Sequence, residues 1–144
     1  MALSKVMYTA RVTVTGGRDG EAVSEDGRLR LKMVPPKEMG GDGGEGTNPE
    51  QLFAAGYAAC FLSAMKMVAG KRGIQISAEP SVTAAVGIGP HGKGFGLQAE
   101  LTVRLPGMDE AAAKALADEA HQVCPYSNAT RNNIDVTITV KTGA

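Results

Sequence analysis

Two cysteines are the strongest chemical signals in the sequence. Cys60 lies in the middle of an apolar stretch, residues 47–73, and Cys124 lies directly before Pro125. The two are far apart in the chain and form no Cys-x-x-Cys pair. In a reducing compartment such cysteines are either two buried thiols or a catalytic pair rather than a structural disulfide. Because free cysteine is among the most buried residue types, inert core thiols remain an alternative at this point.

The neighbours of Cys60 decide whether its thiol can react. Gly56, Tyr57 and Ala64 lie one helical turn away, and these apolar surroundings raise the pKa of a thiol by desolvation. Cys60 lies too far into the predicted helix for the positive N-terminal end to lower that pKa. A reactive thiolate therefore needs a cation from another element. Arg18, in the turn "TGGRDG", is the candidate, and an ordinary solvated turn arginine is the alternative.

The histidines and a glycine motif give no further site. His121 and Cys124 have the spacing of two metal ligands on one helix, but two ligands do not make a zinc site and the sequence has no second pair. Neither His121 nor His91 pairs by spacing with Cys60 as a hydrolase base. Residues 87–92 match G-x-G-x-x-G, but a strand follows where a dinucleotide site needs a helix. We therefore predict no metal and no resident cofactor.

The first part of the chain has the alternation of β-strands. Apolar residues alternate through residues 7–16, a glycine-rich turn follows, and Asp26-Gly27 sits where a tight hairpin needs positive φ. This pattern predicts two or three antiparallel strands. Residues 35–46 carry so many glycines that we expect a mobile connecting loop.

The apolar stretch has clear helix boundaries. Asn48 is a suitable N-cap, Pro49 suits the first helical position, and Glu50 favours the positive end of the helix dipole. Gly70 and Gly73 mark the other end. Since the interior is apolar on nearly every face, we expect this helix to be covered all round at the centre of the fold.

The rest of the chain predicts a hairpin, a helix and a closing strand. Residues 81–89 and 95–105 form the hairpin, residues 108–123 an amphipathic helix capped by Asp109, and residues 133–141 the last strand. Hairpins flanking two helices predict an α+β fold with antiparallel sheets. A length of 144 residues with 43% hydrophobic content predicts a single domain, residues 1–144.

Composition excludes several classes of partner. Fifteen basic and fifteen acidic residues leave no net charge, and no basic run is present, so we expect neither nucleic acid nor anionic lipid as a partner. The apolar run 52–65 is shorter than a membrane span and contains Gly and Ser, which suits a core helix. We read no export signal at the start of the sequence and predict a cytoplasmic protein.

Two long motifs bring a resemblance to a known family. The segments "NPEQLFAAGYAACF" and "CPYSNATRNNIDV", with the opening strands and the "TGGRDG" turn, closely resemble the organic hydroperoxide resistance branch of the Ohr/OsmC family. The resemblance implies a thiol peroxidase in which Cys60 attacks the peroxide and Cys124 is the resolving cysteine. It also implies that Arg18 stabilises the thiolate and that Glu50 orients this arginine. The implied fold is an intertwined homodimer with antiparallel sheets wrapped around central apolar helices, and the implied electron donors are dihydrolipoyl groups of lipoylated proteins.

This chemistry fits the residues around Cys60. An organic hydroperoxide needs an apolar pocket for its tail, which Phe53, Tyr57 and Met67 are placed to supply. Attack leaves a sulfenic acid on Cys60, which condenses with Cys124 to a disulfide. Two alternatives remain. One is an OsmC-like peroxidase of broader substrate range, and the other is a non-enzymatic dimeric domain that binds an apolar ligand and has inert cysteines.

Helix geometry adds one expectation about the dimer. Glu50 and Cys60 lie ten residues apart on one predicted helix, which separates their backbones by roughly 15 Å along the axis. A single arginine cannot bridge this separation. If Arg18 contacts both groups, as the resemblance implies, Glu50 must come from the other subunit.

Overall fold

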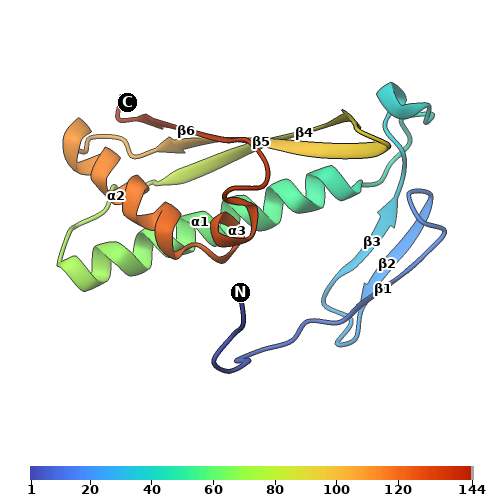
Figure 1. Cartoon of the computed structure of the whole chain (residues 1–144), viewed down its shortest axis with the longest axis horizontal. Coiled ribbons are helices and arrows are strands. Elements are labelled where there is room, and N and C mark those ends of the chain that lie inside the picture. Colours follow the sequence, from blue (N-terminus) through green and yellow to red (C-terminus); the bar gives the residue numbers. More distant parts are fainter. Residues whose placement is uncertain (144) are drawn as a thin grey trace. The chain divides into compact units, whose positions relative to one another are not determined.

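The structure is a computed structural model that describes residues 1–143 (Figure 1). The chain divides into two compact units, Met1–Pro49 and the part from Glu50 onward, and each is described by itself. The predicted organisation as one domain therefore stays a prediction.

The N-terminal unit is built on a three-stranded antiparallel sheet of order β1-β2-β3, as predicted. Its strands are β1 (Val12–Thr15), β2 (Gly20–Ser24) and β3 (Arg30–Met33), and a short 3-10 helix, η1 (Lys37–Met39), follows. The β2-β3 turn is fixed by Asp26, whose Oδ1 accepts hydrogen bonds from the Ser24 hydroxyl at 2.7 Å and the Arg28 N–H at 3.0 Å. Gly27 supplies the positive φ of 75° that this turn requires.

The two faces of this sheet differ in chemistry. Residues opposite each other in register share a face, so Val14, Ala22 and Leu31 lie in one row across the three strands. The other face carries polar side chains, including the ion pair of Glu21 with Arg30 at 2.7 Å. Although the first face is apolar, Val14 is 49% exposed and Leu31 is 36% exposed. Ala22, between them on the central strand, is buried, so this apolar face is open on its outer strands in a single chain.

Helix α1 (Pro49–Arg72) has the bounds that its sequence signals predict. Gly73 adopts a φ of 67°, and the Ile74 N–H donates to the Ala69 carbonyl at 2.9 Å, which satisfies an end carbonyl in the Schellman manner. By length and composition alone, α1 is long enough and apolar enough to cross a membrane. Its buried side chains instead belong to the core of the second unit; they are Tyr57, Phe61, Ala64, Met65, Val68 and Ala69.

The second sheet has the order β4-β5-β6, with strands β4 (Ser81–His91), β5 (Gly94–Arg104) and β6 (Val136–Lys141). One face is apolar on all three strands, as the row Ala84, Leu101 and Ile138 illustrates. This face packs into the core cluster together with α1 and α2 (Glu110–Val123) (Figure 1). The predicted α+β architecture is therefore confirmed.

One strand pairing differs from the predicted antiparallel sheets. β6 pairs with β5 in parallel, for example Leu101 with Ile138, so this sheet is mixed. The cause is the connection: the chain leaves β5, forms two helices on one side of the sheet and returns, and such a crossover makes the next strand parallel. The alternation of apolar residues predicts that residues 133–141 form a strand, but it does not predict whether the neighbouring strand runs parallel or antiparallel.

Two helices occupy this crossover, of which the sequence predicted only the first. Helix α2 is capped as expected by Asp109, whose carboxylate accepts a hydrogen bond from the Ala112 N–H at 3.0 Å. Cys124 ends α2 and begins α3 (Pro125–Thr130), a helix of only six residues. Such a short helix is unstable alone, so contacts with the rest of the unit must hold it in place.

Candidate active site

The two cysteines meet although they are far apart in the sequence. Cys60 is half-buried on α1, and Cys124 is fully buried at the junction of α2 and α3. Both are free thiols, and their side chains are close enough to form a hydrogen bond. The second unit alone therefore brings together the two groups that a thiol–disulfide reaction needs.

The pKa of the Cys60 thiol is raised above its ordinary value. Burial is the largest cause, and the neighbouring Cys124 raises the pKa further. The backbone N–H of Tyr126 acts in the opposite direction because it hydrogen-bonds to the Cys60 sulfur and favours the thiolate. The balance favours the protonated thiol, so activation requires additional positive charge.

Three aromatic rings lie on α1 and α3 beside the thiols. The Phe53 and Tyr57 ring centroids are 6.2 Å apart, and Tyr126 lies 6.0 Å from the first ring and 5.7 Å from the second. A Cβ at Gly56 would approach the Tyr126 hydroxyl to 2.5 Å, so a larger residue here would displace this ring. Tyr126 remains 36% exposed, and its ring thus forms an apolar surface near Cys60.

A buried hydrogen-bonded chain runs beneath these rings. The Tyr57 hydroxyl lies 2.8 Å from the Ser127 Oγ and 3.2 Å from the Thr130 Oγ1. The Ser127 Oγ is in turn 2.8 Å from the His121 Nδ1. Burial, followed by the charge of Arg131, lowers the pKa of His121, while Asp118 opposes this shift. The lowered pKa favours the neutral imidazole, whose Nδ1 donates to or accepts from the Ser127 hydroxyl according to its tautomer.

Arg131 joins the ends of α2 and α3. Its guanidinium donates to the Asn128 Oδ1 at 2.8 Å and, through Nη2, to the carbonyl of His121. A cation at the last carbonyls of α2 also interacts favourably with the helix dipole. Arg131 thereby fixes the bend that carries Cys124.

The predicted arginine lies in the N-terminal unit. Arg18 is half-buried in the turn between β1 and β2. This turn depends on glycine: Gly16 has a φ of 76°, and a Cβ at Gly20 would come within 1.8 Å of the Thr15 carbonyl oxygen. The sequence thus builds a tight, defined turn around Arg18.

The remaining predicted residues lie along α1. Glu50 is in the first turn and half-buried, ten residues before Cys60 on the same continuous helix. The helix keeps these two backbones about 15 Å apart within one chain. Phe53 and Met67 lie two turns to either side of Cys60 on the same stripe. Tyr57 is fully buried, whereas Met67 is 47% exposed.

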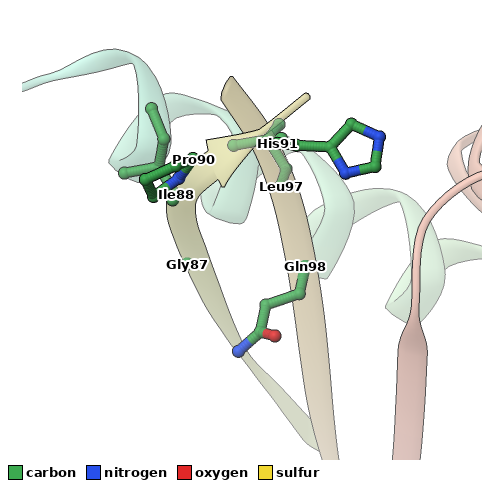
Figure 2. A pocket seen from close by; sticks show the side chains of 8 residues that line it. Gly87, Ile88, Pro90, His91, Leu97 and Gln98 are labelled. Atoms are coloured by element: carbon green, nitrogen blue, oxygen red, sulfur yellow. The ribbon is translucent and has the colours of Figure 1, made fainter. Parts of the chain in front are cut away.

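A surface hollow at the end of the β4-β5 hairpin has a separate set of lining residues. It has a volume of about 320 Å³ and lies between the two strands, where Figure 2 shows Ile88, His91 and Gln98 around it. No predicted site residue lines this hollow. The G-x-G-x-x-G sequence that it includes runs along β4 into the hairpin turn, which confirms that it is no dinucleotide-binding turn.

In the part of the chain that the structure describes, acidic, histidine and cysteine side chains do not gather into a metal site. Within residues 1–143 no group of three or more of them is placed to hold an ion. His121 and Cys124, which have metal-ligand spacing, instead face Ser127 and Cys60 respectively.

Sequence reasoning missed Tyr126 and Ser127. Tyr126 contributes a backbone N–H to the Cys60 sulfur and a ring to the aromatic cluster, and Ser127 links Tyr57 to His121. Their position directly after Cys124-Pro125 was the available signal, since residues beside a reactive thiol share its surroundings.

Comparisons with known proteins agree on one family. A family model described as OsmC-like protein matches residues 41–139. The organic hydroperoxide resistance protein of Xanthomonas axonopodis pv. citri (strain 306) is 59% identical over 136 residues, which cover 94% of this chain and 96% of that protein.

Solved structures show the same fold. The crystal structure of an organic hydroperoxide resistance protein from Elizabethkingia anophelis, with crystallant-derived thiocyanate bound, matches with a TM-score of 0.91 and 48% identity. The match covers 96% of this chain and 99% of that one. The organic hydroperoxide resistance protein OhrB of Bacillus subtilis matches with a TM-score of 0.86 and 41% identity, covering 94% of this chain and all of its own.

Proposed function

This chain belongs to the OsmC-like family, and from that premise we propose that it is a cysteine-based peroxidase that reduces organic hydroperoxides to alcohols. The observation that carries the proposal is the contact between the Cys60 and Cys124 side chains in the second unit. Two thiols held together in this way can pass from dithiol to disulfide without a large rearrangement of the chain.

The first step oxidises Cys60. Its thiolate attacks the terminal oxygen of the hydroperoxide, so that an S–O bond forms, the O–O bond breaks and the alkoxide leaves and takes up a proton as the alcohol. The product on the protein is a sulfenic acid. Because burial raises the pKa of Cys60, this step requires a cation, and we assign that role to Arg18 with Glu50 orienting it.

The second step forms the disulfide. The Cys124 sulfur attacks the Cys60 sulfur, an S–S bond forms, the S–O bond breaks, and hydroxide leaves with the Cys124 proton as water. This closure prevents oxidation of Cys60 beyond the sulfenic acid. A dithiol then reduces the disulfide by exchange and becomes a disulfide itself. We assign this role to dihydrolipoyl groups of lipoylated proteins.

Apolar side chains beside Cys60 support an organic substrate. Phe53 and Tyr126 form an aromatic surface near the thiol, the fully buried Tyr57 packs against both rings, and Met67 extends the apolar stripe on the other side. Such a surface gains free energy by covering the tail of a lipid-like hydroperoxide, while hydrogen peroxide has no tail to bury. We therefore expect organic hydroperoxides to react faster than hydrogen peroxide.

The open apolar face of the first sheet supports an intertwined homodimer. Val14 and Leu31 are partly exposed in one chain, and a second copy of the chain would cover them. On α1, Ala55, Ala59 and Ser63 are also exposed on one stripe, where small side chains allow close helix packing. In this dimer Glu50 of one subunit serves Cys60 of the other. We further propose a cytoplasmic location, where cysteines persist as thiols.

Mass spectrometry after one equivalent of cumene hydroperoxide tests the proposal. Wild-type protein is expected to lose two hydrogens as the Cys60–Cys124 disulfide forms. Cys124→Ser is expected to react once and stop with one added oxygen on Cys60, and Cys60→Ser is expected not to react. Unchanged thiols in the wild type would instead favour a non-enzymatic domain with inert cysteines.

Steady-state rates test the assignment of substrate and donor. Dihydrolipoamide is expected to support turnover better than glutathione or thioredoxin, and cumene hydroperoxide is expected to be reduced faster than hydrogen peroxide. Equal rates with both peroxides would point to an OsmC-like peroxidase of broader range. Faster turnover with glutathione or thioredoxin would overturn the assignment of the lipoyl donor.

A further inference from the structure

Two contacts between α1 and the segment around α3 form a ladder. Cys60 meets Cys124, and Tyr57, three residues earlier on α1, meets Ser127, three residues later in the other segment. The two segments therefore lie antiparallel to each other, and their two contacts, the rungs of the ladder, are one helical turn apart. The first rung is the reacting pair, and the second is a hydrogen bond.

From this ladder we propose that the chain Tyr57–Ser127–His121 is a positioning device for disulfide closure. The inference rests on the proposed Cys60–Cys124 disulfide and adds residues that touch neither peroxide nor sulfur. The second rung sets the register of α3 on α1, and that register holds Cys124 against Cys60.

The weakness of α3 makes such a device necessary. With six residues, α3 has too few internal hydrogen bonds to hold itself, and its N-cap residue, Cys124, makes no side-chain capping bond. Ser127 and Tyr57 are fully buried and Thr130 nearly so, so a lost partner would leave a buried polar group unsatisfied. A shift of α3 along α1 would break these buried hydrogen bonds at a cost in free energy, and this cost keeps Cys124 in place.

The donors and acceptors of the chain can be assigned completely. Thr130 donates its hydroxyl proton to the Ser127 carbonyl at 3.3 Å, so Tyr57 donates to the Thr130 Oγ1 at 3.2 Å. Ser127 then donates to the Tyr57 hydroxyl, and the Nδ1–H of neutral His121 donates to the Ser127 Oγ. His121 is fixed in turn because its carbonyl accepts from Arg131. The chain therefore connects α1, α3 and the C-terminal end of α2.

Positioning of Cys124 affects mainly the second chemical step. Attack on the peroxide uses Cys60, whose place is set by α1, and α3 assists this step through the Tyr126 N–H on the sulfur. Closure needs the two sulfurs aligned, and a small misplacement of one reacting atom slows a step strongly. Loss of the chain is thus expected to slow closure, lengthen the life of the sulfenic acid and raise overoxidation of Cys60.

Rapid-quench measurements separate the two steps. Protein is mixed with one equivalent of cumene hydroperoxide, and mass spectrometry follows the sulfenic acid, trapped with dimedone, and the disulfide. Ser127→Ala is expected to slow closure about tenfold and Tyr57→Phe about threefold, since each lost bond weakens alignment by a modest free energy. Attack on the peroxide is expected to stay within about twofold of wild type in both variants.

A matched control and a rescue distinguish positioning from general stability. Ser77→Ala removes another buried hydroxyl, which donates to the Pro106 carbonyl at 2.7 Å, and is expected to leave closure unchanged. His121→Leu is expected to slow closure, whereas His121→Asn, whose amide occupies the place of Nδ1, is expected to restore it.

The outcomes separate this inference from the proposed function. If wild-type protein forms no disulfide, the proposed function fails and this inference fails with it. If the wild type closes normally and folded Tyr57→Phe and His121→Leu close as fast as Ser77→Ala, the inference alone is wrong. If Ser127→Ala does not fold, these two milder variants decide.

Discussion

Within residues 1–143 the chain forms two three-stranded sheets, each with one apolar face, and these faces are covered to different extents. In the second unit, α1 and α2 cover the face that carries Leu101, and this leucine is fully buried. In the first unit, Val14 and Leu31 on the corresponding face remain partly exposed. The strands of both sheets alternate apolar and polar residues, yet their apolar side chains differ in exposure. The reason is that α1 and α2 pack on the second sheet within its own unit. The second unit can hold the thiol pair by itself, while the first needs another surface.

The strongest test of this comparison mixes two inactive variants. If a second copy completes the molecule, a heterodimer of Cys60→Ser with Glu50→Ala chains has one intact site, with Cys60 from one chain and Glu50 from the other. Peroxidase activity is therefore expected to reappear from two parents that have almost none. A verified heterodimer without activity would place Glu50 and Cys60 in the same subunit's site and contradict the shared arrangement.

A substitution in the first unit tests whether that unit takes part in the chemistry. Arg18→Lys keeps the charge but loses the planar fork that can contact thiolate and carboxylate together. We expect the rate of peroxide attack to fall about 10- to 100-fold, the range that follows from losing a charge-assisted hydrogen bond. Stopped-flow measurement at saturating cumene hydroperoxide checks this. Arg28→Lys, in the exposed β2-β3 turn, is the matched control, and equal rates for Arg18→Lys would leave Arg18 as a turn residue.

Leucine substitutions on the two sheets test directly how strongly the apolar face of each sheet is buried. Leu101→Ala is expected to cost about 2 to 5 kcal/mol of unfolding free energy, as is usual for a buried leucine. Leu31→Ala is expected to lower the melting temperature mainly at low protein concentration, because it weakens a surface between two copies. Thermal unfolding over a range of concentrations measures both. If the effect of Leu31→Ala does not depend on concentration, the first sheet is not covered by a second copy.

The smallest expected effect concerns the pH dependence of stability in the second unit. Burial and Arg131 lower the pKa of His121, so the folded protein binds this proton less readily than the unfolded chain. The stabilisation is complete above the ordinary histidine pKa of about 6.5 and is lost as the pH falls below it. His121→Asn is expected to reduce this acid-induced loss in denaturant titrations. Parallel pH profiles for the variant and the wild type would contradict the assignment.

Local signals explain how much of the fold could be predicted. The bounds of α1 follow from Pro49 at its start and Gly73 at its end, both of which act within one turn. The parallel direction of β6 and the short helix α3 were not predicted, because a crossover and packing against α1 determine them. Propensity alone does not make a helix of six residues.

The candidate site shows the same division. Cys60 and Cys124 were recognised as candidates by residue type and by resemblance, and the structure brings their side chains together. Tyr126 acts on Cys60 through its backbone N–H, which has no signature in a sequence. Ser127 depends on Tyr57 and His121, and such buried partnerships appear only after the chain has folded. The roles of Arg18 and Glu50 stay predictions.

The parallel pairing of β6 has a consequence for the order of folding. The β4-β5 hairpin closes locally, whereas β6 must wait for the whole α2-α3 crossover, and contacts between distant parts of a chain form slowly. Cys124 ends α2 within that crossover, so we expect a newly made chain to present Cys60 before its partner is in place. During this interval an oxidant would meet Cys60 without a partner for the proposed disulfide. The topology thus predicts a stage of folding in which Cys60 is open to overoxidation, and this stage ends when β6 joins the sheet.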